Sequence, residues 1–108
     1  MIRVTFGNNK QFDYIHYYCV PTQIGLVNKF EQTEYYPYDS IKKIEKQVKD
    51  LSSEELWYYA VKKYKSQLDT ILIMTNCVYI CLKGWNLPDV LLSFEEFVDI
   101  TDFVKGAK

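Results

Sequence analysis

The chain has 108 residues, a length that favours one domain able to bury a core without disulfides or metal. Hydrophobic residues make up 48% and charged residues 25%, as in ordinary globular proteins. The net charge of −1, with twelve lysines and one arginine, argues against a protein that reads nucleic acid or binds an anionic membrane.

The first twenty residues predict a β-hairpin. Residues 2–6 alternate apolar and polar side chains, which is typical of a strand. The turn signal "GNNK" follows at 7–10. Residues 11–20 form the second strand, which ends before Pro21 because proline cannot donate a ladder hydrogen bond. "GLVNKFEQ", residues 25–32, is a candidate third strand.

An aromatic loop is predicted at "EYYPYDS", residues 34–40. Pro37 disfavours helical geometry at Tyr36. Tyr35, Tyr36 and Tyr38 would thus surround a proline in a loop, and tyrosine is favoured in recognition surfaces. The alternative is that one or two of these rings close the edge of the core.

Two consecutive helices are predicted next, as a helical hairpin over a sheet. Residues 39–51 carry apolar side chains at spacings of three and four, which favour a helix. Ser52 and Glu55 fit a capping box that starts a second helix. The apolar stripe of the second helix comprises Trp57, Ala60, Val61, Tyr64 and Leu68.

The C-terminal third predicts strands and then a helix. Residues 70–75 and 77–83 are apolar at almost every position, which predicts strands covered on both faces, either as a hairpin or as one long strand. Ser93 and Glu96 fit a capping box for a helix over 93–106. The order β-β-(β)-α-α-β-β-α predicts a single α+β domain over 1–108, with an antiparallel or mixed sheet of four to five strands and three helices.

Histidine and cysteine suggest a metal or thiol site, but their spacing argues against it. His16 and Cys19 are three apart in a predicted strand, so they point to opposite faces. Cys77 and Cys81 share a face but lie about 13 Å apart along a strand. Three cysteines do not suit a disulfide framework and favour a reduced, cytoplasmic protein. We therefore expect no metal, no cofactor and no catalytic residue.

Two charged surfaces are the remaining candidates. Residues 41–65 carry seven lysines and four acids, which predicts a lysine face on the two helices. Glu95, Asp99 and Asp102 would form an acidic stripe on the last helix, complementary to a basic partner. Solvation alone would also explain both surfaces.

The leading functional hypothesis is a non-catalytic protein-binding module. In size and composition the chain is similar to small bacterial and phage inhibitor and immunity proteins. The partner, possibly basic, would bind an aromatic loop and an acidic helix; the candidate residues are Tyr35, Tyr36, Tyr38, Trp85, Glu95, Glu96, Asp99 and Asp102. The alternatives are a nucleic-acid accessory protein that uses the lysine face, and a small thiol- or metal-dependent enzyme. No membrane span is expected, because the longest apolar run, 71–82, is too short.

Overall fold

The computed structural model describes residues 1–84 and 88–106 and is mostly β, with 48% strand and 26% helical residues. The chain divides into two compact units. Unit 1 combines residues 1–46 with the C-terminal residues from Asp99 onward, and unit 2 comprises Gln47–Val98. The prediction of a single domain stays a prediction.

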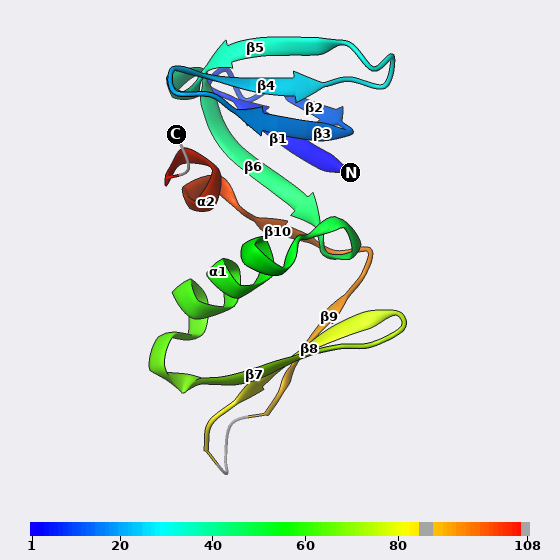
Figure 1. Cartoon of the computed structure of the whole chain (residues 1–108), viewed down its shortest axis with the longest axis vertical. Helices are drawn as coiled ribbons and strands as arrows, with labels where there is room; N and C mark the ends of the chain where they lie inside the picture. Colours follow the sequence, from blue (N-terminus) through cyan, green and yellow to red (C-terminus); the bar gives the residue numbers. More distant parts are fainter. Residues whose placement is uncertain (85–87, 107–108) are drawn as a thin grey trace. The chain divides into compact units, whose positions relative to one another are not determined.

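Unit 1 is built from two antiparallel sheets (Figure 1). One sheet has the order β10-β6-β1-β2, and the other has the order β3-β4-β5. The strands of these sheets are β1 (Ile2–Phe6), β2 (Gln11–Tyr14), β3 (His16–Cys19), β4 (Gln23–Val27), β5 (Thr33–Pro37), β6 (Ile41–Gln47) and β10 (Phe97–Asp99). The unit boundaries fall within β6, before Gln47, and within β10, before Asp99. Unit 1 also contains the short 3₁₀ turn η1 (Tyr38–Ser40) and the short helix α2 (Thr101–Gly106).

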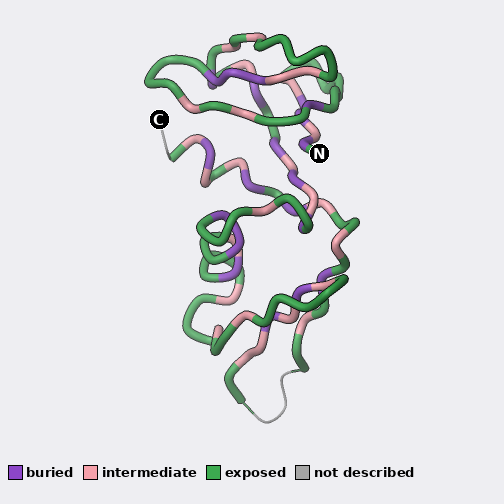
Figure 2. Tube along the Cα trace, turned by 45° about the vertical axis from the view of Figure 1, so that its right-hand side comes forward, coloured by how far each residue is buried: buried purple, intermediate pink, exposed green. Residues whose placement is uncertain are grey.

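Branched aliphatic side chains from both sheets and from α2 form the core of unit 1, and the buried stretches are purple in Figure 2. β1 contributes alternate residues to this core, as its sequence predicts. The least exposed members are Ile2, Val4, Ile24, Leu26, Ile41, Ile44 and Val104.

The N-terminal hairpin is confirmed, but its second strand is shorter than predicted. The turn after Phe6 is closed by hydrogen bonds, and Asn9 adopts the positive φ of 67° that asparagine tolerates. The predicted strand over 11–20 divides at Ile15: β2 pairs with β1, whereas β3 pairs with β4 in the other sheet. Of the candidate strand at 25–32, only residues 25–27 lie in a strand, β4, and the remaining residues form a turn.

The predicted helix over 39–51 is wrong, since this segment forms strand β6 and a short 3₁₀ turn, η2 (Val48–Asp50). The register of β6 against β1 shifts by one residue, so Phe6 pairs with Ile41 but Thr5 pairs with Lys43. Such a bulge inserts one residue into the strand. It buries both Ile41 and Ile44, and their spacing of three then imitates a helical stripe.

Unit 2 contains the one long helix among the described residues, α1 (Ser53–Tyr64), with the predicted start. The Ser52 hydroxyl accepts from the Glu55 amide at 3.2 Å, and the Glu55 carboxylate accepts from the Ser52 amide at 2.8 Å. The buried face differs from the predicted stripe. Leu56 and Ala60 are buried, whereas Trp57 is exposed.

The sheet of unit 2 has the order β7-β8-β9 and is antiparallel throughout. A 3₁₀ turn, η3 (Lys65–Gln67), leads from α1 into it, and its strands are β7 (Leu68–Ile73), β8 (Cys77–Leu82) and β9 (Val90–Ser93). Residues 70–83 are therefore a hairpin rather than one strand. The expectation that both faces are covered is wrong, because most of β7 is exposed.

The predicted helix over 93–106 is also wrong. Its first residues end β9 and form a turn, its middle is strand β10, and only Thr101–Gly106 is helical. β-branched and aromatic side chains dominate the segment that becomes β10, and these residues favour strands. The described residues thus form three sheets, one long helix and a short C-terminal helix, and not one sheet with three helices.

Candidate functional site

The three tyrosines of the predicted loop lie in a strand and a 3₁₀ turn, and they have different surroundings. The Tyr35 ring is 57% exposed and lies over Gly25, its partner across the sheet. Tyr38 is buried, and its hydroxyl donates to the Val20 carbonyl at 2.7 Å. Burial raises the pKa of Tyr38 to about 12. Tyr38 therefore belongs to the core, whereas Tyr36 lines a hollow.

The predicted acidic stripe does not form, because its residues lie in a turn, in a strand and in α2. Glu95 and Glu96 share the turn after β9 in unit 2. Glu95 forms an ion pair with Lys49 at 3.5 Å, and Glu96 accepts from the Ser93 amide at 2.6 Å. Both carboxylates thus have local partners that explain their positions.

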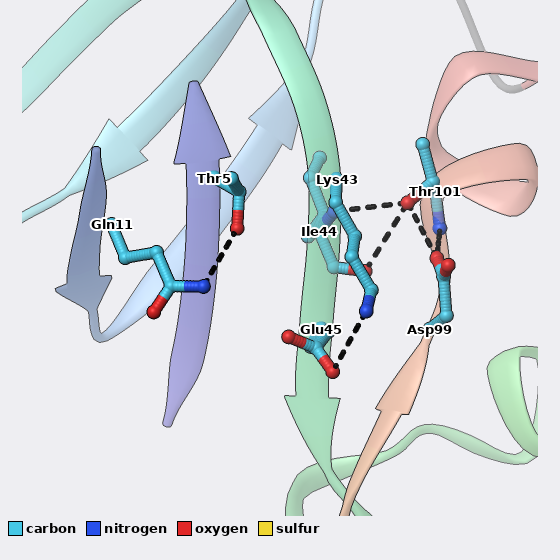
Figure 3. Close-up of polar contacts among 7 residues, drawn as sticks. All are labelled: Thr5, Gln11, Lys43, Ile44, Glu45, Asp99 and Thr101. Atoms are coloured by element: carbon cyan, nitrogen blue, oxygen red, sulfur yellow. Dashed lines mark hydrogen bonds and ion pairs between the residues drawn. The ribbon is translucent and has the colours of Figure 1, made fainter. Parts of the chain in front are cut away.

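Asp99 ends β10 in unit 1, and Asp102 lies exposed in the first turn of α2. The Asp99 carboxylate accepts from the amide and the hydroxyl of Thr101 (Figure 3). The Thr101 hydroxyl in turn accepts from the Ile44 amide at 2.9 Å. Asp99 therefore helps to join α2 to β6. Trp85, the last predicted site residue, lies outside the described residues.

The histidine and the cysteines have separate local contacts within their own units. His16 is exposed and packs edge-to-face against Tyr18 at 4.8 Å. Cys19 donates from Sγ to the Val104 carbonyl at 3.7 Å, and Cys77 and Cys81 lie on β8 in unit 2. Among residues 1–84 and 88–106, no three potential metal ligands are grouped.

A hollow of about 540 Å³ lies at one end of the sheet that contains β1, β2 and β6. We call it the aromatic hollow. The hollow is open to solvent, so it suits one side chain of a larger partner better than an enclosed small molecule. Its lining residues are Phe6, Gly7, Asn8, Lys10, Phe12, Tyr36 and Ser40.

Three aromatic rings form the apolar side of the aromatic hollow. Phe6 packs edge-to-face against Phe12, with ring centroids 5.8 Å apart, and against Tyr36, with centroids 4.9 Å apart. The Phe12 side chain remains 51% exposed. Edge-to-face pairs fix ring orientation, so these rings present a preformed surface to a ligand.

A buttress of hydrogen bonds holds Tyr36 behind this surface. The Glu34 carboxylate accepts from the Tyr36 hydroxyl at 2.6 Å, from the Tyr14 hydroxyl at 3.2 Å and from Asn28 Nδ2 at 3.0 Å. The hydrogen bond from Tyr36, followed by that from Asn28, lowers the pKa of Glu34. The hydrogen bond to Glu34 raises the pKa of Tyr36. At neutral pH the cluster therefore consists of one carboxylate and two neutral phenols.

Lys10 lines the aromatic hollow and adds positive charge to it. The Lys10 ammonium makes no hydrogen bond or ion pair with any residue that the structure describes, and it is available to a ligand. The Lys42 ammonium donates to Asn9 Oδ1 at 2.8 Å, which places it at the same turn. The hollow thus combines an apolar wall with a cation that can pair with a carboxylate.

Sequence reasoning identified Tyr36 but missed its neighbours. Phe6 and Phe12 flank the turn signal, and the antiparallel register that pairs Val4 with Phe12 puts both phenylalanines on one face. The turn signal at 7–10, with Phe6 and Phe12 on either side, could therefore have identified both rings from the sequence. The role of Glu34 was not predictable, because Tyr14 lies twenty residues away and in another sheet.

No family model, no curated protein and no solved structure matches this chain significantly. Within the described residues, no helix has the length and apolar character that a bilayer crossing requires.

Proposed function

We propose that the chain is a non-catalytic protein-binding module, comparable to small inhibitor and immunity proteins, that acts in the cytoplasm. The partner inserts an apolar or aromatic side chain into the aromatic hollow, and a carboxylate beside that side chain pairs with Lys10. The observation that carries this proposal is the preformed, half-exposed set of Phe6, Phe12 and Tyr36 beside an ammonium with no described partner. The three free cysteines fit a reducing compartment.

The chemistry of the hollow favours a protein over other ligands. Aromatic side chains that are already fixed lose little conformational entropy on binding, and they dominate the binding energy of many protein interfaces. The acidic helix was the basis for expecting a basic partner, and that helix is absent from the described structure. The free cation at the hollow instead favours a partner with an acidic group at the contact.

The nucleic-acid alternative loses its main basis. The predicted lysine face required a helix over 39–51, and this segment is β6 followed by η2. Lys46, one of its members, is buried and lies 5.5 Å from the centre of the Tyr17 ring. A lysine in this position contributes to the fold of unit 1 rather than to a solvated basic face.

Affinity purification from the source organism tests the proposal, with three baits compared side by side. Wild-type protein and Phe30→Ala should retain the same partner, because Phe30 is exposed but lies outside the hollow. Phe12→Ala should lose that partner while its circular dichroism spectrum stays native. Equal retention by all three baits would rule out the hollow as the binding site. Steeply salt-dependent binding of single-stranded oligonucleotides at the hollow would replace the protein partner with nucleic acid.

A further inference from the structure

Strand β2 lies at an edge of its sheet, next to the aromatic hollow. The Phe6 amide donates to the Lys10 carbonyl at 2.9 Å, so these two residues form a hydrogen-bonded pair. Because hydrogen-bonded pairs alternate along an antiparallel ladder, the main-chain groups of Phe12 also point toward β1. The main-chain N–H and C=O groups of Gln11 and Asp13 therefore point away from β1.

The side chains at this edge leave its main chain uncovered. The Gln11 side chain turns back over β1, where Nε2 donates to Thr5 Oγ1 at 3.3 Å (Figure 3). The Asp13 carboxylate also turns toward β1, since it accepts from Arg3 Nε at 3.4 Å. Within the part of the chain that the structure describes, no hydrogen bond outside the β1 ladder uses the main chain of Gln11 or Asp13. Their N–H and C=O groups are thus available to a further strand.

The other edges of the two sheets in unit 1 are less complete. Strand β5 also lines the hollow, through Tyr36, and its hairpin has the Asn28 amide donating to the Gln32 carbonyl at 2.9 Å. By the same alternation, Tyr35 and Pro37 face outward on either side of Tyr36. Pro37 has no N–H, so this edge lacks a donor that β2 offers. Of the remaining edge strands, β3 contacts α2, and β10 has only three residues.

We infer, on the basis of the function proposed above, that the partner of the aromatic hollow binds as an extended segment that adds a strand to the edge of β2. An extended polypeptide supplies N–H and C=O groups at the spacing that Gln11 and Asp13 require, whereas a nucleic acid or a lipid does not. The main-chain hydrogen bonds supply affinity, and the hollow beside them supplies specificity for one side chain.

The register of the added strand predicts which side chains the segment carries. Lys10 and Phe12 lie two residues apart and both line the hollow, so they share one face of the sheet. The partner residues opposite them point to the same face, with β-carbons about 4.5–5.5 Å away. An apolar side chain opposite Phe12 enters the hollow, and an acid opposite Lys10 pairs with its ammonium. In the antiparallel direction, which β1 uses with both of its neighbours, the partner sequence reads apolar, any residue, acidic.

NMR titration of the labelled chain with a capped heptapeptide tests strand addition. The peptide has phenylalanine at its third position, glutamate at its fifth and threonine elsewhere, so its fourth residue pairs with Gln11. Its binding should shift the amide resonances of Gln11 and Asp13, and methylation of its fourth amide nitrogen should raise the dissociation constant at least about tenfold. Methylation of its third amide nitrogen is the matched control, because that N–H points away from β2. An equal loss of affinity from both methylated peptides, or no shift at millimolar peptide, would overturn the proposal.

Two variants of Asp13 separate the added strand from the hollow itself. Asp13→Pro removes an outward N–H without removing a donor from the β1 ladder, and Asp13→Ala removes only the side chain. Wild-type protein and Asp13→Ala should retain the partner captured from the source organism, and Asp13→Pro should lose it while its circular dichroism spectrum stays native. Loss of the partner with Phe12→Ala but not with Asp13→Pro would overturn strand addition and leave the hollow as the binding site. Retention by both Phe12→Ala and Asp13→Pro would overturn the proposed function as well.

Discussion

The aromatic hollow of unit 1 and the exposed face of the unit 2 sheet are both apolar surfaces on antiparallel sheets, but they are constructed differently. We call the second surface the outer face; it is the row of Leu72, Tyr79 and Leu91 across β7, β8 and β9. In the hollow, Tyr36 is fixed by a hydrogen bond to Glu34, and Lys10 stands at the rim. In the outer face, the Tyr79 hydroxyl makes no hydrogen bond within the described residues. The hollow therefore offers a partner both fixed rings and a cation, which exposed apolar area alone would not have shown.

The strongest test of this comparison changes one residue on each surface. Phe12→Ala should weaken binding of the captured partner by about 30-fold or more, which is about 2 kcal/mol and typical of a central aromatic contact. Leu91→Asp, on the outer face, should leave partner binding unchanged. Calorimetric titration of the partner against both variants and wild-type protein measures the two effects. An equal loss of affinity in both variants would show that the partner does not bind through the aromatic hollow alone.

Charge at the hollow should have a smaller effect. Lys10→Glu should reduce partner affinity by about tenfold and reduce its dependence on salt, because it removes an attraction and adds a repulsion. Lys29→Glu is the control, since Lys29 lies over Phe30 and does not line the hollow. Titrations at low and high salt measure both. Identical affinities for the two variants would show that Lys10 contacts nothing on the partner.

The hydrogen bonds that hold Tyr36 at the hollow should contribute to the free energy of unfolding. Tyr36→Phe removes the donor to Glu34 and should lower the free energy of unfolding by about 1 kcal/mol. Tyr79→Phe, on the outer face, should change it by less than about 0.5 kcal/mol. Urea denaturation of both variants and of wild-type protein measures the difference. A loss of the same size from both variants would contradict the structural distinction between the surfaces.

The smallest expected effect is a loss of stability of unit 1 at acidic pH. Hydrogen bonds hold the pKa of Glu34 below its usual 4.5, so the folded state favours the carboxylate. The stabilisation is therefore present above pH 4.5 and is lost as the pH falls through the lower native pKa. The melting temperature should fall over this range, and Glu34→Gln should reduce the fall. A variant with the same acid profile as wild-type protein would show that Glu34 does not cause it.

Two similar local signals show how much of the fold the sequence predicts. Ser52 and Ser93 are each followed by glutamate three positions later, and both glutamates accept from the serine amide. Only Ser52 starts a helix. Helix-favouring residues such as Leu56 and Ala60 follow it, whereas β-branched and aromatic residues follow Ser93. A capping box therefore identifies a turn of chain and needs a compatible sequence after it to predict a helix.

The wrong prediction of a helix over 39–51 has a different cause. The bulge between β1 and β6 gives a strand the apolar spacing of a helix. Spacing alone cannot separate the two cases, because the bulge is defined only by the partner strand. The hairpin at 2–14 was predictable, since alternation on both sides of a turn signal is a local feature. The apolar run at 70–83 left a hairpin and one long strand open, because its turn carries no strong signal.

The candidate site was predictable in part for the same reason. Tyr36 was selected for its residue type, and Phe6 and Phe12 could have been added from the hairpin register. The hydrogen bonds to Glu34 depend on tertiary structure, because they bring β2 to β5. The predicted acidic stripe was wrong because it assumed that Glu95, Asp99 and Asp102 lie on one helix.

Hydrogen–deuterium exchange of the chain with and without its captured partner tests the central claim most directly. The partner should slow exchange at the amides of residues 6–12 and 34–40, which surround the aromatic hollow. Exchange in β7, β8 and β9 should not change. Protection confined to unit 2, with no change around the hollow, would contradict the account.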